Sequence, residues 1–128
     1  MIDAATVIED VLDTGASARF RASGDSMLPT IRPGDLLEVE RVNPAAIRRG
    51  DVVLARLSRG LTAHRIVRIF AKGEAIHFVM RGDNTPEDDE PFDASALIGR
   101  VRTRRRPPVI FALLRACRRL SGRQYVSS

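Results

Sequence analysis

The chain has 128 residues, of which 44% are hydrophobic and 29% are charged. These values are typical of one globular domain that is long enough to bury a hydrophobic core. Its single cysteine, Cys117, excludes an internal disulfide, and no segment reaches the roughly 20 apolar residues of a membrane span. Because the start of the chain also lacks a secretory pattern, we expect a protein that is cytoplasmic or peripheral at the cytoplasmic membrane.

Positive charge is concentrated at the end of the chain. Residues 101–128 contain eight arginines and no acidic residue, whereas the formal net charge of the whole chain is only +5. Residues 1–100 therefore carry a net negative charge, and the basic character belongs to the tail. We expect one domain over residues 1–106 and a basic amphipathic tail over residues 107–128.

The elements predicted in chain order begin with a short amphipathic helix over residues 3–14, which Asp3 can cap and Gly15 can end. Strand patterns follow. We expect strands over residues 19–22, 36–42, 51–57, 61–70, 76–80 and 97–101. Short strands joined by tight turns predict a mainly β domain, with a coiled, antiparallel, barrel-like sheet.

The turn between the first two strands carries a candidate nucleophile. Residues 23–35 read Ser-Gly-Asp-Ser-Met-Leu-Pro-Thr-Ile-Arg-Pro-Gly-Asp, and the second serine is Ser26. Gly24 allows a close backbone approach or a positive φ, and Pro29 stiffens the exit from the turn. A serine held in this way is exposed and fixed, as covalent catalysis requires.

The strand over residues 61–70 carries a candidate general base, His64. Alternation places Thr62, His64, Ile66 and Phe70 on one side of this strand. Imidazole titrates near neutrality, so His64 could take the hydroxyl proton of a serine and return it to a leaving amine.

The remaining candidates for a base or a metal site are weak. His77 has no surrounding motif and is expected to be a structural or exposed strand residue, and the only lysine, Lys72, lies in a turn beside a glycine. Neither histidine has partners at metal-ligand spacing. We therefore expect neither a metal nor another cofactor.

Three segments together resemble the signal peptidase I and LexA-like serine peptidases, and are most similar to the histidine-type signal peptidases of the endoplasmic reticulum and archaea. The similarity extends over roughly residues 17–101. It implies a serine endopeptidase that cleaves a protein or propeptide after small residues, as in signal peptide processing. Those relatives usually carry a membrane anchor, whereas we expect none here because no segment is long and apolar enough. The three segments are Ser23–Asp35, the Gly50–Leu54 hairpin with His64–Val67, and Met80–Asp89.

The same resemblance implies roles for the carboxylates near residue 89. Asp89 would orient His64, and Asp83, in a basic-Gly-Asp-Asn motif, would shape the site beside it. A carboxylate that accepts from imidazole fixes the tautomer and stabilises the imidazolium. Asp88 is the nearest rival for this role, and an acidic run of this kind is also typical of a solvated loop.

One position departs from the signal peptidase pattern. Many of those enzymes carry a hydroxyl residue two places before the nucleophile, where this chain and the LexA-like branch have glycine, here Gly24. The resemblance therefore implies an oxyanion held by backbone N–H groups, including that of Ser26. A LexA-like self-cleaving regulator is the alternative, although those relatives use a lysine base, and the few residues before Ser26 contain no Ala-Gly pair. A catalytically inactive binding module is the third hypothesis.

The basic segment over residues 104–120 has competing uses. Apolar residues and arginines fall on different sides at helical spacing, which is typical of a helix that contacts an anionic membrane. The apolar side could equally pack on the domain. Nucleic acid is an unlikely partner, because neither aromatic stacking residues nor a helix-turn-helix accompany the arginines.

Overall fold

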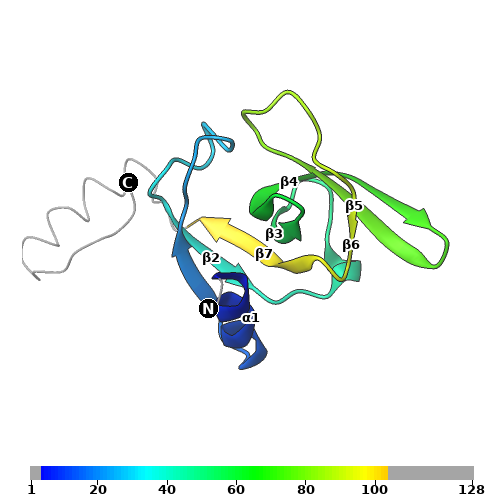
Figure 1. Ribbon diagram of the computed structural model, residues 1–128, viewed down its shortest axis with the longest axis horizontal. Coiled ribbons are helices and arrows are strands. Elements are labelled where there is room, and N and C mark those ends of the chain that lie inside the picture. Colours follow the sequence, from blue (N-terminus) through cyan, green and yellow to red (C-terminus); the bar gives the residue numbers. More distant parts are fainter. Residues whose placement is uncertain (1–3, 104–128) are drawn as a thin grey trace, which may run out of the picture.

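The computed structural model describes residues 4–103, which form one helix and seven strands (Figure 1). No helix in this part of the chain is long and apolar enough to cross a membrane. The predicted helix and the six predicted strands are confirmed, whereas β6 is new and only two residues long. The predicted tail helix lies outside the described residues. The elements are α1 (Ala4–Asp13), β1 (Ala18–Arg21), β2 (Leu36–Glu40), a 3₁₀ turn η1 (Pro44–Ala46), β3 (Val52–Leu57), β4 (Gly60–Lys72), β5 (Ala75–Arg81), β6 (Phe92–Asp93) and β7 (Leu97–Thr103).

All seven strands belong to one antiparallel sheet in the order β1-β2-β7-β3-β4-β5-β6. The sheet is coiled, and β4 and β5 form a long hairpin that points away from α1 (Figure 1). Within residues 4–103 the edge strands β1 and β6 do not pair with each other, so the expected barrel-like sheet is not closed. With four and two residues, these edges offer no long ladder for closure.

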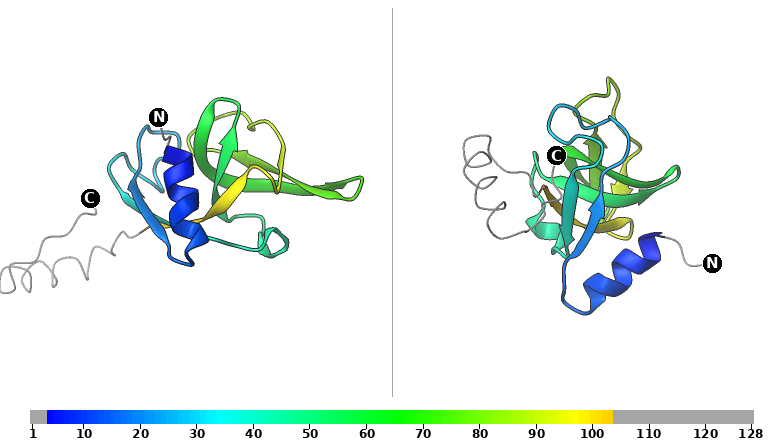
Figure 2. Two further views of the ribbon diagram at one scale, coloured as in Figure 1. Left: turned by 60° about the horizontal axis from the view of Figure 1, so that its bottom comes forward. Right: turned by 90° about the vertical axis from the view of Figure 1, so that its left-hand side faces the viewer.

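The sheet buries two hydrophobic clusters. The first lies where α1 packs beside β1 and β2, and its helix contributes Ala5 and Leu12, both almost fully buried (Figure 2). The second lies between β3, β4 and β5 and includes Ile66 and Phe78. Full burial of a large apolar side chain contributes about 1.5–3 kcal/mol, so these clusters fix the strands that carry the candidate site.

A bulge changes which residues of β4 face inward. The pairing of β4 with β5 shifts register at Val67, which has no partner. On either side of the bulge, Ile66 and Ile69 both pack on the second cluster. Phe70 instead stacks on the imidazole of His77 in β5, with ring centroids 5.5 Å apart. The expectation that Phe70 shares a side with His64 is therefore wrong, because one extra residue reverses the alternation.

Candidate active site

The connection between β1 and β2, residues 22–35, forms the loop that carries Ser26, here called the Ser26 loop. Its ends are pinned together, since Ala22 N–H donates to the Asp35 carbonyl at 2.9 Å and Gly34 N–H donates to the Ala22 carbonyl at 2.8 Å. Gly24 has a φ of 76°, which glycine adopts without strain. The turn is thus held in shape by its ends and by glycine.

Buried side chains anchor the same loop from within. Met27 and Ile31 are 5% and 4% exposed and belong to the first hydrophobic cluster. Asp35 is fully buried, and its Oδ2 accepts from the backbone N–H of Arg32 at 2.9 Å. Ser26 therefore sits on a loop whose neighbours cannot move freely.

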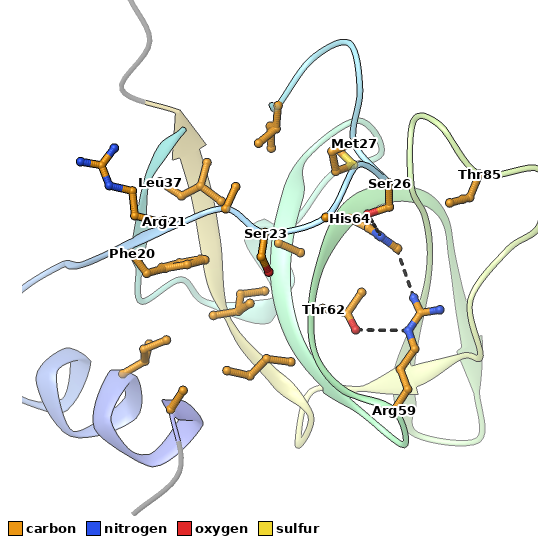
Figure 3. Close-up of a pocket in the computed structure, with 18 residues that line it drawn as sticks. Phe20, Arg21, Ser23, Ser26, Met27, Leu37, Arg59, Thr62, His64 and Thr85 are labelled. Carbon is orange, nitrogen blue, oxygen red and sulfur yellow. Dashed lines mark hydrogen bonds between the residues drawn. The ribbon is translucent and has the colours of Figure 1, made fainter. Parts of the chain in front are cut away.

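Ser26, His64 and Asp89 form one chain of contacts. The Ser26 Oγ lies 2.9 Å from the His64 Nε2, and the His64 Nδ1 lies 2.6 Å from the Asp89 Oδ2. His64 is 4% exposed, and the Asp89 side chain is 6% exposed. A carboxylate has no hydrogen to give, so Nδ1–H donates to Asp89. Nε2 is left to accept from the serine hydroxyl (Figure 3). The structure thus brings together three residues from separate segments.

Arg59 also contacts this carboxylate, and sequence reasoning missed it. Its Nη2 donates to the Asp89 Oδ1. Its Nε donates to the Thr62 Oγ1 at 3.4 Å (Figure 3). The Nη2 lies 3.5 Å from the His64 Nδ1, but both atoms carry hydrogens, so they are neighbours of one carboxylate rather than hydrogen-bond partners. The one signal in the sequence was that Arg59 lies in the turn that precedes β4, the strand that carries His64.

Asp83 lies beside these residues in a different network. Arg65 donates to its Oδ1 and Oδ2 at 2.9 and 2.8 Å, and the Thr30 hydroxyl donates to its Oδ2 at 2.6 Å. The hydrogen bond from Arg65 holds the pKa of Asp83 below its ordinary value, with help from Thr30 and against partial burial, and raises the pKa of Arg65. Asp83 therefore ties the Ser26 loop to β4. Asp88 is half exposed and pairs with Arg81 at 3.5 Å.

Gly82 is a second residue that sequence reasoning missed as a site residue. A Cβ at this position would lie 2.6 Å from the Ser26 carbonyl oxygen and 3.1 Å from the His64 Nε2. Two residues later, Asn84 N–H donates to the same Ser26 carbonyl at 2.8 Å, and its side chain donates to the Asp25 carbonyl at 3.1 Å. The basic-Gly-Asp-Asn motif contained Gly82. Only the fold shows that the backbone at Gly82 passes so close to the Ser26 carbonyl that a side chain would not fit.

A pocket of about 500 Å³ adjoins Ser26 and His64, and is here called the Ser26 pocket. Most of its lining comes from α1, β1, the Ser26 loop and β4, and includes Ile8, Phe20 and Leu61. Residues 4–103 contain no group of three or more histidine, cysteine or acidic residues that could hold a metal ion. The site thus combines a hydroxyl, an imidazole and a carboxylate with an adjoining pocket.

Comparison with known proteins assigns the family. No curated protein matches the chain. A family model described as Peptidase S24-like matches residues 2–102. Because this match covers most of the chain, the protein belongs to the Peptidase S24-like family, whose membership implies a serine-type peptidase.

Proposed function

We propose that the protein is a serine endopeptidase of the signal-peptidase type, which cleaves a protein or propeptide after a small residue. The observation that carries this proposal is the continuous hydrogen-bonded chain from Ser26 through His64 to Asp89. This arrangement of nucleophile, base and orienting carboxylate is suited to acyl transfer to serine. The preference for small residues comes from the resemblance to signal peptidases.

In the acylation step, the Ser26 Oγ attacks the carbonyl carbon of the scissile bond while its proton passes to the His64 Nε2. Asp89 stabilises the resulting imidazolium through the Nδ1–H that it already accepts. The tetrahedral intermediate then collapses, the C–N bond breaks, and the Nε2 proton goes to the leaving amine. The products of this step are an ester on Ser26 and a peptide with a free amino terminus.

In the deacylation step, a water molecule replaces the leaving amine. The His64 Nε2 takes one of its protons as the oxygen attacks the ester carbonyl, and then returns that proton to the Ser26 Oγ. The second product leaves with a carboxyl group, and the enzyme regains its starting protonation state.

The negative oxygen of each tetrahedral intermediate needs hydrogen-bond donors. Gly24 has no side chain to provide one, so we assign this role to backbone N–H groups, including that of Ser26. Loss of a single such donor typically costs about 10²–10³-fold in rate, so the missing hydroxyl predicts slow turnover. Asp83 would support the site indirectly by fixing the Ser26 loop against β4.

The direct test is to incubate the full chain with a peptide library and to identify the cut sites by mass spectrometry. Ser26→Ala should abolish cleavage, whereas Ser17→Ala, at an exposed position outside the site, should cleave like the wild type. The same comparison applies to His64→Ala and His77→Ala. Cleavage confined to the protein's own chain would favour the self-cleaving regulator, and the absence of any Ser26-dependent cleavage would leave the inactive binding module.

We further propose a peripheral contact between residues 104–120 and an anionic membrane surface, supported by the arginines of this segment. Deletion of residues 107–128 should weaken sedimentation with anionic vesicles at low salt. Unchanged sedimentation would favour the alternative, in which the segment packs on the domain.

A further inference from the structure

The Ser26 pocket is larger than a small residue at the cut would need. Its volume of about 500 Å³ falls within the range of about 300–1,000 Å³ that is usual for ligand sites. Ser26 and His64 lie at one end of the pocket, and Phe20 and helix α1 lie toward the other (Figure 3). The pocket therefore continues well beyond the reacting atoms.

The end away from Ser26 is apolar. Ile8 of α1, Phe20 of β1 and Leu61 of β4 line it, and each is only partly buried. Helix α1 also contributes Ala4, whereas Val7 of the same helix is 50% exposed and is not part of the lining. Walls of this kind favour hydrocarbon over water, because a bound apolar side chain would cover surface that is now accessible.

We propose that this end of the Ser26 pocket binds a large aliphatic or aromatic side chain of the peptide substrate, at a position other than that of the small residue at the cut. Helix α1 then acts as a specificity element for the peptidase. This inference rests on the proposed function, since the occupant is identified by the continuity of the pocket with Ser26 and His64.

The first experiment measures kcat/KM for a peptide set in which each position around the cut carries Ala, Leu or Phe. At one position other than the cut residue, Leu or Phe should exceed Ala by roughly 10–200-fold, the discrimination that an apolar pocket provides. Equal kcat/KM values at every such position would overturn the proposal.

Two substitutions on α1 should change this preference in opposite directions. Ala4→Phe narrows the pocket and should reduce the ratio of Leu or Phe to Ala peptides by at least about tenfold. Ile8→Ala widens it and should shift the preference from Leu toward Phe. Val7→Phe is the matched control on the exposed side of the helix and should leave the ratio unchanged, with folding of each variant checked by thermal unfolding. A preference that neither Ala4→Phe nor Ile8→Ala alters would overturn the assignment to α1.

A binding measurement separates this inference from the proposed function. The Ser26→Ala variant should bind the Leu or Phe peptides more tightly than the Ala peptide, and Ala4→Phe added to it should remove that difference. Such binding without any Ser26-dependent cleavage would support the pocket and overturn the peptidase. Cleavage without any preference for large residues would do the reverse.

Discussion

Two neighbouring carboxylates differ completely in their surroundings. The side chain of Asp89 is 6% exposed and contacts His64, whereas that of Asp88 is 51% exposed and faces Arg81. Asp89→Asn keeps the shape but presents an amide to the imidazole, so it should lower kcat/KM by about 10³–10⁴-fold. Asp88→Asn should stay within a few-fold of the wild type. Steady-state kinetics of both variants decide the matter, and a sensitive Asp88 would contradict our assignment of the carboxylate.

Gly82 permits a close approach that no other residue can make. Its φ is not in the left-handed region, so the constraint is steric. Gly82→Ala would place a methyl group 2.6 Å from the Ser26 carbonyl oxygen, a backbone atom that cannot rotate aside. We expect at least about a tenfold loss of kcat/KM and a lower melting temperature, because inserted bulk in a packed site typically costs about 1–3 kcal/mol. Glu87→Ala, at an exposed position of the following segment, is the control, and a Gly82→Ala variant that matches it in both measurements would show that the loops separate easily.

The sequence suggested the proximity of Ser26, His64 and Asp89, and the structure brings these side chains within hydrogen-bonding distance. This suggestion came from three motifs that follow one another in the same order as in the signal peptidase I and LexA-like peptidases. Arg59 and Gly82 escaped notice because their importance depends on which backbone or carboxylate lies opposite. Such neighbours are set by strand register and loop path, which a residue pattern alone does not specify.

At the scale of elements, the turn between β3 and β4 is fastened to residues 89–90. The backbone N–H and the hydroxyl of Ser58 donate to the Glu90 Oε1 at 2.7 and 2.6 Å, and these bonds hold the pKa of Glu90 below its ordinary value. The next residue of the turn, Arg59, donates to Asp89. The turn therefore positions the carboxylate that faces the imidazole.

The Arg59 contact can be tested by steady-state kinetics. Arg59→Ala removes the group that donates to the Asp89 Oδ1 and to the Thr62 Oγ1, so Asp89 is held less firmly against the imidazole. Because a hydrogen bond to a charged group typically contributes about 1.5–3 kcal/mol, we expect kcat/KM to fall by at least about tenfold, and by less in Arg59→Lys, which keeps the charge. Arg68→Ala, on the exposed part of the hairpin over Phe70, should leave kcat/KM unchanged. An Arg59→Ala variant as active as the wild type would show that Asp89 is positioned without this contact.

The sequence predicts where the strands lie, but it predicts only in part which residues of each strand face inward. Alternation located β4 and placed His64 with the buried residues, as the structure confirms. Beyond Val67 the prediction fails, because a bulge leaves no compositional mark in this sequence. The very short β6 was missed for the related reason that two residues cannot establish a period.

For the molecule as a whole, the network around Asp83 predicts a dependence of stability on pH. The pKa of Asp83 is lowered by its hydrogen bond from Arg65, so its contribution is complete above the ordinary aspartate value of about 3.9 and is lost as pH falls through the lower, folded value. Asp83→Asn should melt below the wild type at pH 7, and the difference should shrink toward zero as the pH drops below about 4. Asp88→Asn should melt like the wild type across this range. A constant difference for Asp83→Asn would exclude ionisation as its cause.

The overall architecture followed from short strands and tight turns, but closure of the sheet did not. Closure depends on whether the two edge strands can pair, and β1 and β6, with four and two residues, offer few backbone groups for pairing. Edge strand β1 and helix α1 both line the Ser26 pocket.

The contact between Gly82, Asn84 and the carbonyl of Ser26 has a consequence during synthesis. A nascent chain that has emerged only as far as β5 holds the serine and the imidazole but lacks both the carboxylate and the backbone that rests on the serine loop. The complete site can therefore form only after residues 82–89 have left the ribosome and joined the fold.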